Sequence, residues 1–501
     1  MNLARLLDRW AREAPDHPAL LAGNNWQSWR VTHDRIARVA AGLRTYHSLA
    51  PGDRIALLAR NSAAFFEALL AIAWGGYVAV PLNWRLSAAE IAFQLADTEA
   101  KLVLADDDLC PLLAQASDGC ERRSLVDTID RYVTDARSIG AQVDVAGDDL
   151  FGIFYTGGTT GTPKGVMLTH GNLLANAANV QQLVPFAPSA IQLHAAPMFH
   201  LADLGYAFVS LAHGGAHVFQ PTFNPGSTLD TIGRHGVTHT LLAPAMVDAI
   251  VRDADPRSSN LAHWQHLMYG GAPISEATLE RALAVLPCGL TQGYGQTEAT
   301  HTITSLLPAD HRAFDRNPAR RLSCGRAAPG VEIRIDAPPG ESGEVCARGA
   351  TIMRGYWRRS DETAATVVDG WLHTGDVGVL DAAGYLMLLD RKKDMIVSGA
   401  ENVYSIEVEN ALARHPAVRE VAVIAVPDER WGERVHAVVT LAPAAHITPE
   451  ALQAHCRTLI GGYKVPRSFE FVASLPRSAA GKVQKEILRA PHWTAARRNI
   501  A

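Results

Sequence analysis

The chain has 501 residues, of which 48% are hydrophobic and 19% charged, and it is therefore long enough for two or more ordinary globular domains. Its formal net charge of −5 at pH 7 lacks the basic excess of nucleic-acid-binding proteins, so we expect no nucleic-acid partner. Early acidic residues argue against a signal peptide, and the longest uncharged run, residues 68–84, is short for a membrane span. We therefore expect no integral membrane segment.

The first part of the chain predicts short apolar strands that alternate with helices. Helices are expected over residues 3–13, 32–49, 63–74 and 87–97, and strands over residues 54–59, 77–82 and 101–105. Ser87 and Glu90 form the sequence pattern of a capping box at the start of the fourth helix. This alternation is typical of a parallel sheet with helices on both faces. Residues 106–149 are polar and acidic and predict a plain connection.

A glycine- and threonine-rich stretch follows the next apolar strand. Its polar members are Thr156, Thr159, Thr160, Thr162 and Lys164, interleaved with Gly157, Gly158, Gly161 and Gly165. Glycines let backbone N–H groups approach an anion, hydroxyls add donors, and the lysine adds a positive charge. The stretch therefore predicts a polyphosphate cradle. It is not a Walker A loop, because Lys164 follows a proline and precedes a glycine.

Beyond this loop, strands and helices alternate to about residue 300, and residues 308–330 predict a long surface connection. From residue 331 the pattern changes to short β runs separated by turns, which indicates a β-rich subdomain at about 325–391. A compact α+β module follows over residues 392–501, with a hinge at 391–394. The predicted fold class is α/β. It comprises a large N-terminal domain (1–391) of parallel-rich sheets with helices, and a small mobile C-terminal domain (392–501).

Four further motifs accompany the glycine loop. They are Tyr294-Gly295-Gln296-Thr297-Glu298, the run from Trp371 to Asp376, Asp390-Arg391, and the turn from Pro476 to Lys485 that contains Lys482. Glu298 follows an aromatic turn and could bind Mg²⁺, while Asp376 could accept both hydroxyls of a ribose. Each motif is weak by itself, since a single carboxylate is more often a surface or capping residue. Their joint order and spacing are far more specific.

Taken together, the motifs resemble the adenylate-forming (AMP-binding) superfamily, in its acyl-CoA synthetase branch. The resemblance extends over nearly the whole chain and implies that a carboxylic acid reacts with ATP to give acyl-AMP and pyrophosphate. The acyl group then passes to the thiol of CoA. In this resemblance Lys482, Thr297, Glu298 and His200 are catalytic, Glu298 binds the metal Mg²⁺, and Lys482 bridges the acid and the α-phosphate. The implied ATP- and AMP-binding residues are Thr156, Gly158, Thr159, Thr160, Lys164, Gly270, Gly271, Ala272, Tyr294, Gly295, Asp376 and Arg391.

The same resemblance places CoA and the hinge in the C-terminal part. Lys393 stands at the hinge position, Gly399 would line the pantetheine tunnel, and Trp431 and Tyr463 are candidates for contacts with the CoA nucleotide. Trp431 and Tyr463 are equally compatible with ordinary packing. The chain departs from the family pattern at Gly157, at Ala400 and at Asp390, where relatives commonly have serine, glycine and glycine.

The expected acyl pocket contains Ala299, Thr300 and His301, with windows at residues 200–206, 241–246, 268–272 and 299–304. None of these windows contains Lys or Arg, so we predict a neutral monocarboxylic acid, fatty or aromatic. The alternatives are an adenylation enzyme that loads a carrier protein, a luciferase-like oxidoreductase and a non-catalytic nucleotide-binding protein. Six scattered cysteines indicate a reducing, cytoplasmic location without structural zinc or disulfides. A homodimer is left open.

Overall fold

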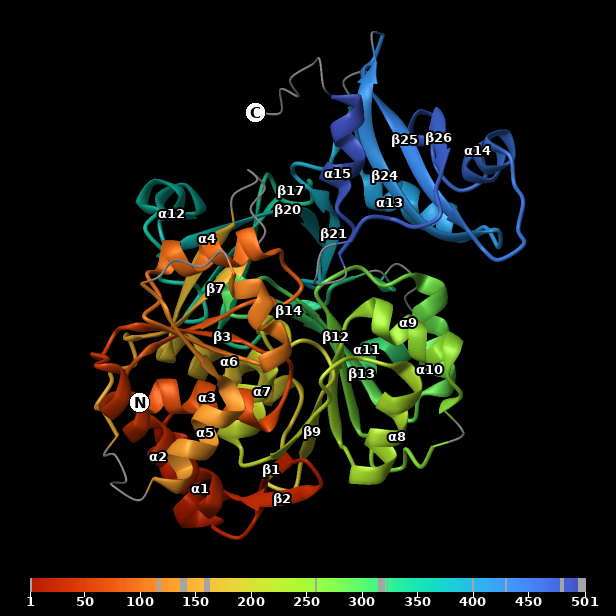
Figure 1. The fold of residues 1–501 in the computed structure, drawn as a ribbon. Helices are drawn as coiled ribbons and strands as arrows, with labels where there is room; N and C mark the ends of the chain where they lie inside the picture. The colour runs from red at the N-terminus through yellow and green to blue at the C-terminus, as the bar shows by residue number, and fades with distance from the viewer. Residues whose placement is uncertain are drawn as a thin grey trace.

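The computed structural model describes residues 2–114, 119–135, 142–156, 163–256, 259–313, 320–321, 323–398, 401–428, 430–477 and 482–493. Figure 1 shows a large N-terminal part, coloured red to green, and a smaller C-terminal part in blue that sits on one end of it. This arrangement agrees with the predicted α/β fold class. The predicted phosphate contacts Gly158, Thr159 and Thr160 in the glycine loop at 157–162, and the predicted tunnel residue Gly399, lie outside the described residues.

One sheet of the N-terminal part has the strand order β18-β8-β7-β4-β3-β5-β6, and its strands from β7 to β6 are parallel. The bounds are β3 Arg54–Leu58, β4 Val78–Pro81, β5 Leu102–Ala105, β6 Glu121–Ser124, β7 Leu150–Thr156, β8 Lys164–Thr169 and β18 Gly355–Tyr356. Alternate strand residues face opposite sides, as a pleated strand requires. On one side they pack on α2, α3 and α5, and on the other on α4 and η1.

These covering elements show why the local sequence folds as it does. Their bounds are α2 Trp29–His47, α3 Ala63–Trp74, α4 Ala88–Thr98, α5 Leu125–Thr134 and η1 Asp107–Leu113, with α1 Arg5–Glu13 packed on α2. The predicted capping box is present at α4, where Ser87 and Glu90 satisfy each other's backbone N–H groups. The segment 106–149 contains β6 and α5 rather than a plain connection, because Leu125 and Ile129 give it a buried apolar face.

A second sheet has the order β15-β14-β13-β12-β11-β9-β10-β1-β2. The bounds are β1 Pro18–Ala22, β2 Asn25–Ser28, β9 Ile191–His194, β10 Ala216–Phe219, β11 His239–Leu242, β12 His266–Gly270, β13 Gly289–Tyr294, β14 Thr304–Leu306 and β15 Arg326–Ala327. Its outer face packs on α8 Pro225–His235, α9 Pro244–Asp253 and α10 Glu276–Val285. Helices α6 His170–Leu183 and α7 Leu201–Ala212 lie between the two sheets and pack on both. The predicted surface connection after residue 307 contains α11 Pro308–Arg312 and β15.

The β-rich segment forms a third sheet, of order β16-β17-β20-β19, with β21 paired to β20. The bounds are β16 Val331–Asp336, β17 Gly343–Gly349, β19 Val367–Val368, β20 Trp371–Leu380, β21 Leu386–Arg391 and the neighbouring α12 Ser360–Thr366. This sheet packs its apolar face on Tyr294, the last residue of β13, and on Ala299, which lies just beyond that strand. The third sheet therefore closes over the carboxyl end of the second sheet, where ligands of open α/β sheets bind.

The C-terminal part has a sheet of order β23-β22-β25-β24, with β26 paired to β25. The bounds are β22 Ile396–Ser398, β23 Glu401–Val403, β24 Val418–Asp428, β25 Gly432–Leu441, β26 Ser468–Phe471, α13 Ser405–Ala413, α14 Pro449–Arg457, η5 Gly462–Lys464, α15 Lys485–Arg489 and η6 Ala490–His492. Helices α13 and α14 cover one face, and α15 covers the other. The domain boundary at 391/392 falls between β21 and β22 and stays a prediction.

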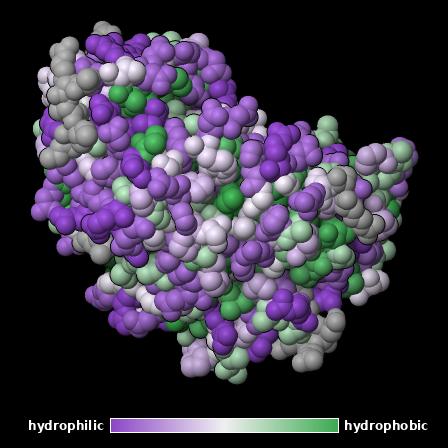
Figure 2. Space-filling view, turned by 90° about the horizontal axis from the view of Figure 1, so that it is seen from below, coloured by the Kyte–Doolittle hydropathy of each residue, from purple (hydrophilic) through white to green (hydrophobic). Residues whose placement is uncertain are grey.

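The surface agrees with the balanced composition. On the face in Figure 2, hydrophilic residues and small hydrophobic groups are intermixed. Across the described part of the chain, no helix combines the length and the apolar composition that crossing a membrane requires.

Candidate active site

The hairpin of β7 and β8 brings the two ends of the glycine loop together. Thr156 and Lys164 are paired across the antiparallel ladder at the point where the loop leaves it. The ammonium of Lys164 forms an ion pair with Glu362 of α12 and lies 5.0 Å from the ring centre of Tyr356. The loop that would contact the phosphates lies outside the described residues. Its lysine, however, is held at the loop base by a carboxylate that the sequence did not single out.

Glu298 lies in the short helix η3, Thr297–Ala299, directly beyond the end of β13, and only 9% of it is exposed. Its carboxylate accepts a hydrogen bond of 3.0 Å from the Tyr356 hydroxyl. Burial raises the pKa of Glu298, although the Tyr356 hydroxyl and the charges of Arg391 and Lys482 act in the opposite direction. A buried carboxylate with nearby cations and few hydrogen-bond donors is suited to hold a cation.

Tyr294, Asp376 and Arg391 form a connected group next to Glu298. The Tyr294 hydroxyl donates to Asp376 over 2.8 Å, and the Arg391 guanidinium lies 3.4 Å from the other carboxylate oxygen. Asp376 and Arg391 are paired across β20 and β21, which fixes their relative position. Burial raises the pKa of Asp376 despite the charge of Arg391. The predicted ribose-binding pair is therefore assembled by one β ladder and anchored by the predicted adenine-binding tyrosine.

Lys482 comes from the C-terminal part and reaches the same place. Its charge acts on the carboxylates of Glu298 and Asp376 and on the ring of His200. The side chain is exposed to solvent, yet crowding by protein atoms and the charge of Arg391 lower its pKa. An isolated pairing between Arg477 and Val483 fixes the backbone next to Lys482. Four motifs that lie far apart in the sequence thus meet at one site.

The glycine positions of the predicted adenine wall are required by close backbone contacts. A Cβ on Gly270 would lie 2.2 Å from the carbonyl oxygen of Gly293 on the neighbouring strand, and Gly271 has a φ of +81°. A Cβ on Gly295 would lie 2.0 Å from the carbonyl oxygen of His301. A side chain at any of these positions would clash or be strained. The backbone around Ala272 and Tyr294 is therefore packed tightly enough to form a fixed wall.

His200 is the residue before α7, and its ring lies against Phe199 with 4.5 Å between ring centres. Burial, with the charges of Lys482 and Arg85, lowers its pKa to about 3, so the imidazole is neutral at pH 7. Its Nε2 is buried and has no hydrogen-bond partner among the described residues. Arg85, an exposed residue outside the predicted windows, is thus a cation that sequence reasoning missed.

The segment predicted to shape the acyl pocket has a strained backbone. Thr300 and His301 have φ values of +55° and +104°, a region that residues with side chains rarely adopt. The Thr300 hydroxyl donates to the carbonyl of Thr351 over 2.5 Å and helps to hold this conformation. Ala299 and Thr300 are fully buried. Burial lowers the pKa of His301 to about 4, so its ring is also neutral.

Comparisons with known proteins support what this geometry indicates. The model of the AMP-binding enzyme family matches residues 7–357, and that of the AMP-binding enzyme C-terminal domain matches residues 407–482. The chain belongs to the AMP-binding enzyme family. The two matched segments account for the large N-terminal part and the small C-terminal domain. The predicted superfamily and fold class are confirmed.

Two curated relatives are similar along almost their whole length. Feruloyl-CoA synthase of an Amycolatopsis species is 38% identical and covers 96% of this chain and 97% of its own. The fatty acid–[acyl-carrier-protein] ligase ScoC of Streptomyces coeruleorubidus is 34% identical and covers 98% and 96%. Both are named as enzymes that ligate an acid to a thiol carrier. The predicted enzyme class, an acid–thiol ligase, is therefore confirmed.

Among solved structures, o-succinylbenzoate CoA synthetase (MenE) of Bacillus subtilis is similar throughout. Its complex with the acyl-adenylate intermediate has a TM-score of 0.86 at 29% identity and covers 99% of both chains. A second structure of that enzyme, with ATP and a magnesium ion, has a TM-score of 0.84 at 28% identity and covers 95% and 98%. The site in this AMP-binding enzyme is thus built on a scaffold that also holds ATP and an acyl adenylate.

The residues predicted to contact CoA lie on the C-terminal domain of this AMP-binding enzyme. Trp431 has the guanidinium groups of Arg430 and Arg467 over its ring, at 4.8 and 4.4 Å, and Tyr463 is 44% exposed. Lys393 is half-buried, and its carbonyl accepts a hydrogen bond from Arg489 of α15. The predicted roles of Trp431, Tyr463 and Lys393 stay predictions.

Sequence reasoning missed three side chains that the fold brings to the site. Tyr356 bonds Glu298, Glu362 pairs with Lys164, and Arg85 lies near His200. Tyr356 and Glu362 flank a pair of arginines in an otherwise plain stretch, so no local pattern marks them. Their proximity to the site arises because the short strand β18 pairs with β8. A reading of the sequence could find them only by first predicting that pairing.

Proposed function

We propose that this enzyme is an ATP-dependent ligase that joins a neutral monocarboxylic acid to CoA through an acyl adenylate. The observation that supports it is the convergence of Lys482 with Glu298, Asp376 and His200 at one site. A lysine from one domain that meets carboxylates from another fits a reaction in which a carboxylate must approach a polyphosphate. In that role the ammonium of Lys482 offsets the repulsion between the two anions.

The nucleotide is positioned by groups from both ends of the site, of which Asp376, Arg391 and Tyr294 are already held by a β ladder and a hydrogen bond. Asp376 accepts the ribose hydroxyls, Arg391 lies beside it, and Tyr294 packs on adenine opposite Gly270, Gly271 and Ala272. Thr156, Gly158, Thr159, Thr160 and Lys164 hold the β- and γ-phosphates, and Thr297 contacts the α-phosphate. Lys164 exchanges its present partner, the carboxylate of Glu362, for a phosphate. Most of this work is positioning of reacting groups.

Glu298 is the residue proposed to hold Mg²⁺. Its carboxylate is buried and, among the described residues, accepts a side-chain hydrogen bond from Tyr356 alone, which leaves acceptor capacity for a hard cation. When bound, the ion neutralises charge on the phosphates. The raised pKa of Glu298 means that a cation and the deprotonated side chain stabilise each other. Tyr356 orients the carboxylate.

The acyl group is proposed to be neutral and to carry a hydrogen-bonding group away from its carboxylate. The windows for the pocket overlap an apolar cluster that contains Tyr206, Leu241 and Met268. The Tyr206 hydroxyl in this cluster, and the amide of Asn176 beside the neighbouring Gly205, are buried without hydrogen-bond partners among the described residues. Each such group costs about 1–3 kcal/mol, which a hydroxyl or methoxy group of the substrate would relieve. This favours a hydroxylated aromatic acid over a saturated fatty acid.

Thioester formation requires a second arrangement of the C-terminal domain, reached by rotation at Lys393. That motion withdraws Lys482 and brings the segment around Gly399 to the acyl adenylate, with Trp431 and Tyr463 near the CoA nucleotide. The two half-reactions then use two faces of one domain. A homodimer and a cytoplasmic location remain predictions.

A carrier protein is the alternative acceptor, and the similarity to the acyl-carrier-protein ligase ScoC favours keeping it. The test is a panel of carboxylic acids, with ferulate-like and saturated acids of matched size, scored for AMP release with CoA, with a carrier protein and with neither. We expect fast turnover only with CoA and with hydroxylated aromatic acids. Turnover with a carrier protein alone would overturn the CoA assignment, and a preference for saturated acids would overturn the acyl assignment.

A further inference from the structure

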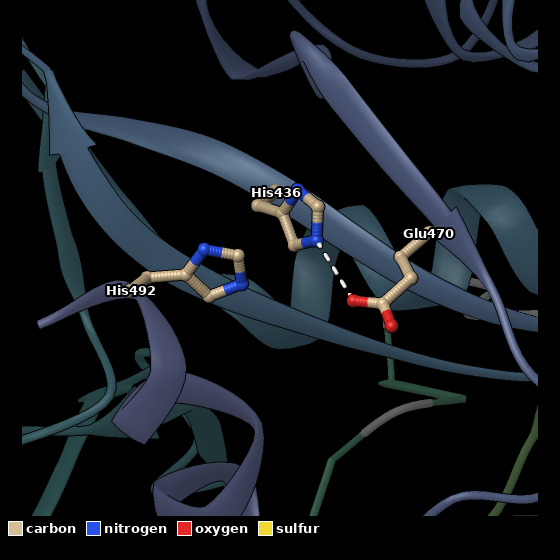
Figure 3. Close-up of side chains that lie close together, drawn as sticks. All are labelled: His436, Glu470 and His492. Atoms are coloured by element: carbon tan, nitrogen blue, oxygen red, sulfur yellow. Dashed lines mark ion pairs between the residues drawn. The ribbon is translucent and has the colours of Figure 1, made fainter.

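Two histidines and a glutamate from three segments of the C-terminal domain converge outside the site described above. They are His436 of β25, Glu470 of β26 and His492 of η6, and one nitrogen or carboxylate oxygen from each lies within 4.8 Å of the others. Figure 3 shows the three side chains turned toward one another, with an ion pair marked between His436 and Glu470. This combination of donor atoms is one that proteins use to bind transition metals.

The sheet geometry explains how the cluster forms. His436 is paired with Ser468 in the parallel ladder of β25 and β26, and residues two apart on a strand share a face. Glu470 therefore lies on the same face as His436. That face is the one on which Val483 and Leu488 pack, so the turn that follows α15 brings His492 over it. The cluster includes no cysteine, and cysteine spacing in the sequence could not reveal it.

His436 is the residue that points to a ligand. Only 6% of it is exposed, and its Nδ1 lies 2.7 Å from the Ser468 hydroxyl. Its Nε2 is buried without a hydrogen-bond partner among the described residues and lies 3.9 Å from a carboxylate oxygen of Glu470. At this distance the Nε2 points at the Glu470 carboxylate without a hydrogen bond, and a cation between the two atoms would give each of them a partner.

We propose that His436, Glu470 and His492 bind one divalent transition-metal ion, with Zn²⁺ as the first choice. Imidazole nitrogen and carboxylate oxygen bind Zn²⁺ at about 2.0–2.2 Å, so ligand atoms on one tetrahedral ion lie roughly 3.3–3.6 Å apart. The three ligand atoms, now within 4.8 Å of one another, must therefore move closer, and the side chain of Glu470 is 54% exposed and can move. Ser468 orients the His436 ring, as second partners of metal-bound histidines do.

The ion attaches the segment 482–493 to the sheet of the C-terminal domain. The segment that begins at Lys482 is already attached by Lys485, which pairs with Glu409 at 2.7 Å, and by Arg489, which pairs with Asp394 at 2.8 Å. Metal binding at His492 adds an attachment next to the hydrogen bond that the Trp493 indole donates to the Ala425 carbonyl over 3.0 Å. The site is therefore structural, and its occupancy stabilises the C-terminal domain without taking part in the reaction.

The test uses the full chain, stripped of metal and titrated with Zn²⁺ in competition with a chromophoric chelator. The ligand variants are His492→Asn and Glu470→Gln, because both side chains are more exposed than His436 and their loss leaves the core intact. The matched controls are His446→Asn and Glu450→Gln, which change exposed residues of the same domain. We expect one ion per chain in the wild type and the controls, and binding at least about tenfold weaker in both ligand variants.

Two further measurements separate this site from binding by the free cysteines, of which Cys110 is exposed. Co²⁺ in place of Zn²⁺ should give the weak visible bands of nitrogen and oxygen ligands without the intense ultraviolet bands of thiolate ligands. Zn²⁺ should raise the midpoint of thermal unfolding in the wild type and the controls, and should raise it clearly less in the ligand variants at the same Zn²⁺ concentration. Thiolate bands, equal affinity in wild type and variants, or no saturable binding would each overturn the proposal.

Discussion

The two sides of the active site are held in place by very different contacts. On the N-terminal side, Asp376 and Arg391 are fixed by a β ladder, and Tyr294 is buried against them. On the C-terminal side, Lys482 sits on a turn whose attachments, through Lys485 and Arg489, are ion pairs within its own domain and to the hinge. Asp376, Arg391 and Tyr294, the residues proposed to bind the nucleotide, therefore belong to a fixed core, whereas the position of Lys482 depends on how the N-terminal and C-terminal parts are arranged.

Polar pairs at the surface contribute to the contact between the two domains. Arg414 pairs with Glu276 at 2.8 Å, and Tyr404 contacts Ser342 at 2.9 Å, both at exposed positions. Such pairs contribute about 0–1 kcal/mol each. A buried contact is made by Asp390 at the end of β21, whose carboxylate accepts a hydrogen bond from the backbone N–H of Ser405 at the start of α13. These contacts are compatible with a C-terminal domain that can move away from the N-terminal part.

The largest expected effect comes from a substitution on the C-terminal side of the active site alone. Lys482→Ala should slow acyl-adenylate formation by about 10²–10³-fold, because a charge aimed at the reacting anions is lost. It should largely spare thioester formation from supplied acyl adenylate. Pyrophosphate release and single-turnover thioester assays measure the two steps, with Lys101→Ala, an exposed lysine, as the control. Equal loss in both steps would contradict the domain motion.

The pH profile of the wild type is a second test of the role of the Lys482 charge. The pKa of Lys482 is lowered, so its positive charge is lost at a lower pH than that of an ordinary lysine, about 10.4. The alkaline limb of kcat/KM for ATP, which reports the free enzyme, should therefore fall below that value. Lys482→Arg should move this limb to higher pH, since a guanidinium stays protonated. A limb that is unchanged in Lys482→Arg would assign it to another group.

The next effect tests the N-terminal side. Glu298→Gln keeps the shape of the side chain but removes its charge, and it should lower the adenylation rate by about 10²-fold and raise the Mg²⁺ concentration needed. Tyr356→Phe removes only the hydrogen bond to Glu298 and should cost about 10-fold or more. Pyrophosphate exchange as a function of Mg²⁺ measures both variants. An unaltered Mg²⁺ requirement in Glu298→Gln would place the metal elsewhere.

A smaller effect concerns the buried contact between the domains. Asp390→Gly removes the carboxylate that bonds Ser405 and lies near Lys485. Hydrogen bonds to charged groups are worth about 1.5–3 kcal/mol, so adenylation should slow by at least about 10-fold. Thioester formation should be unchanged or faster. Asp390→Asn, which keeps an acceptor, should lie between the wild type and the glycine variant in stopped-flow measurements of each step.

The smallest effect comes from the exposed pair. Arg414→Ala removes the ion pair with Glu276 and should change adenylation by less than about 5-fold, because both side chains remain partly in solvent. The change should shrink further as salt concentration rises. A loss as large as that of Asp390→Gly would show that the exposed contacts, rather than the buried one, hold the domains together.

Much of the fold followed from local patterns. The alternation of apolar strands and helices predicted parallel sheets because buried parallel strands need crossover helices, and the capping box at Ser87 marked a helix start that the structure contains. The segment around α5 was missed, since its few apolar residues stand among many polar ones. Its burial depends on Tyr132 packing against Gly42 of α2, a contact between distant residues.

The amino-acid sequence was sufficient to predict the family, the order of the motifs and the charged residues of the site. Each motif is a short local segment, and its side-chain types indicate its chemistry. Tertiary structure decided which of those residues meet. Tyr356 reaches Glu298 through the pairing of β18 with β8, and His436 meets His492 because α15 folds back over the sheet. Such encounters depend on strand register and on the packing of distant segments, which no local spacing specifies.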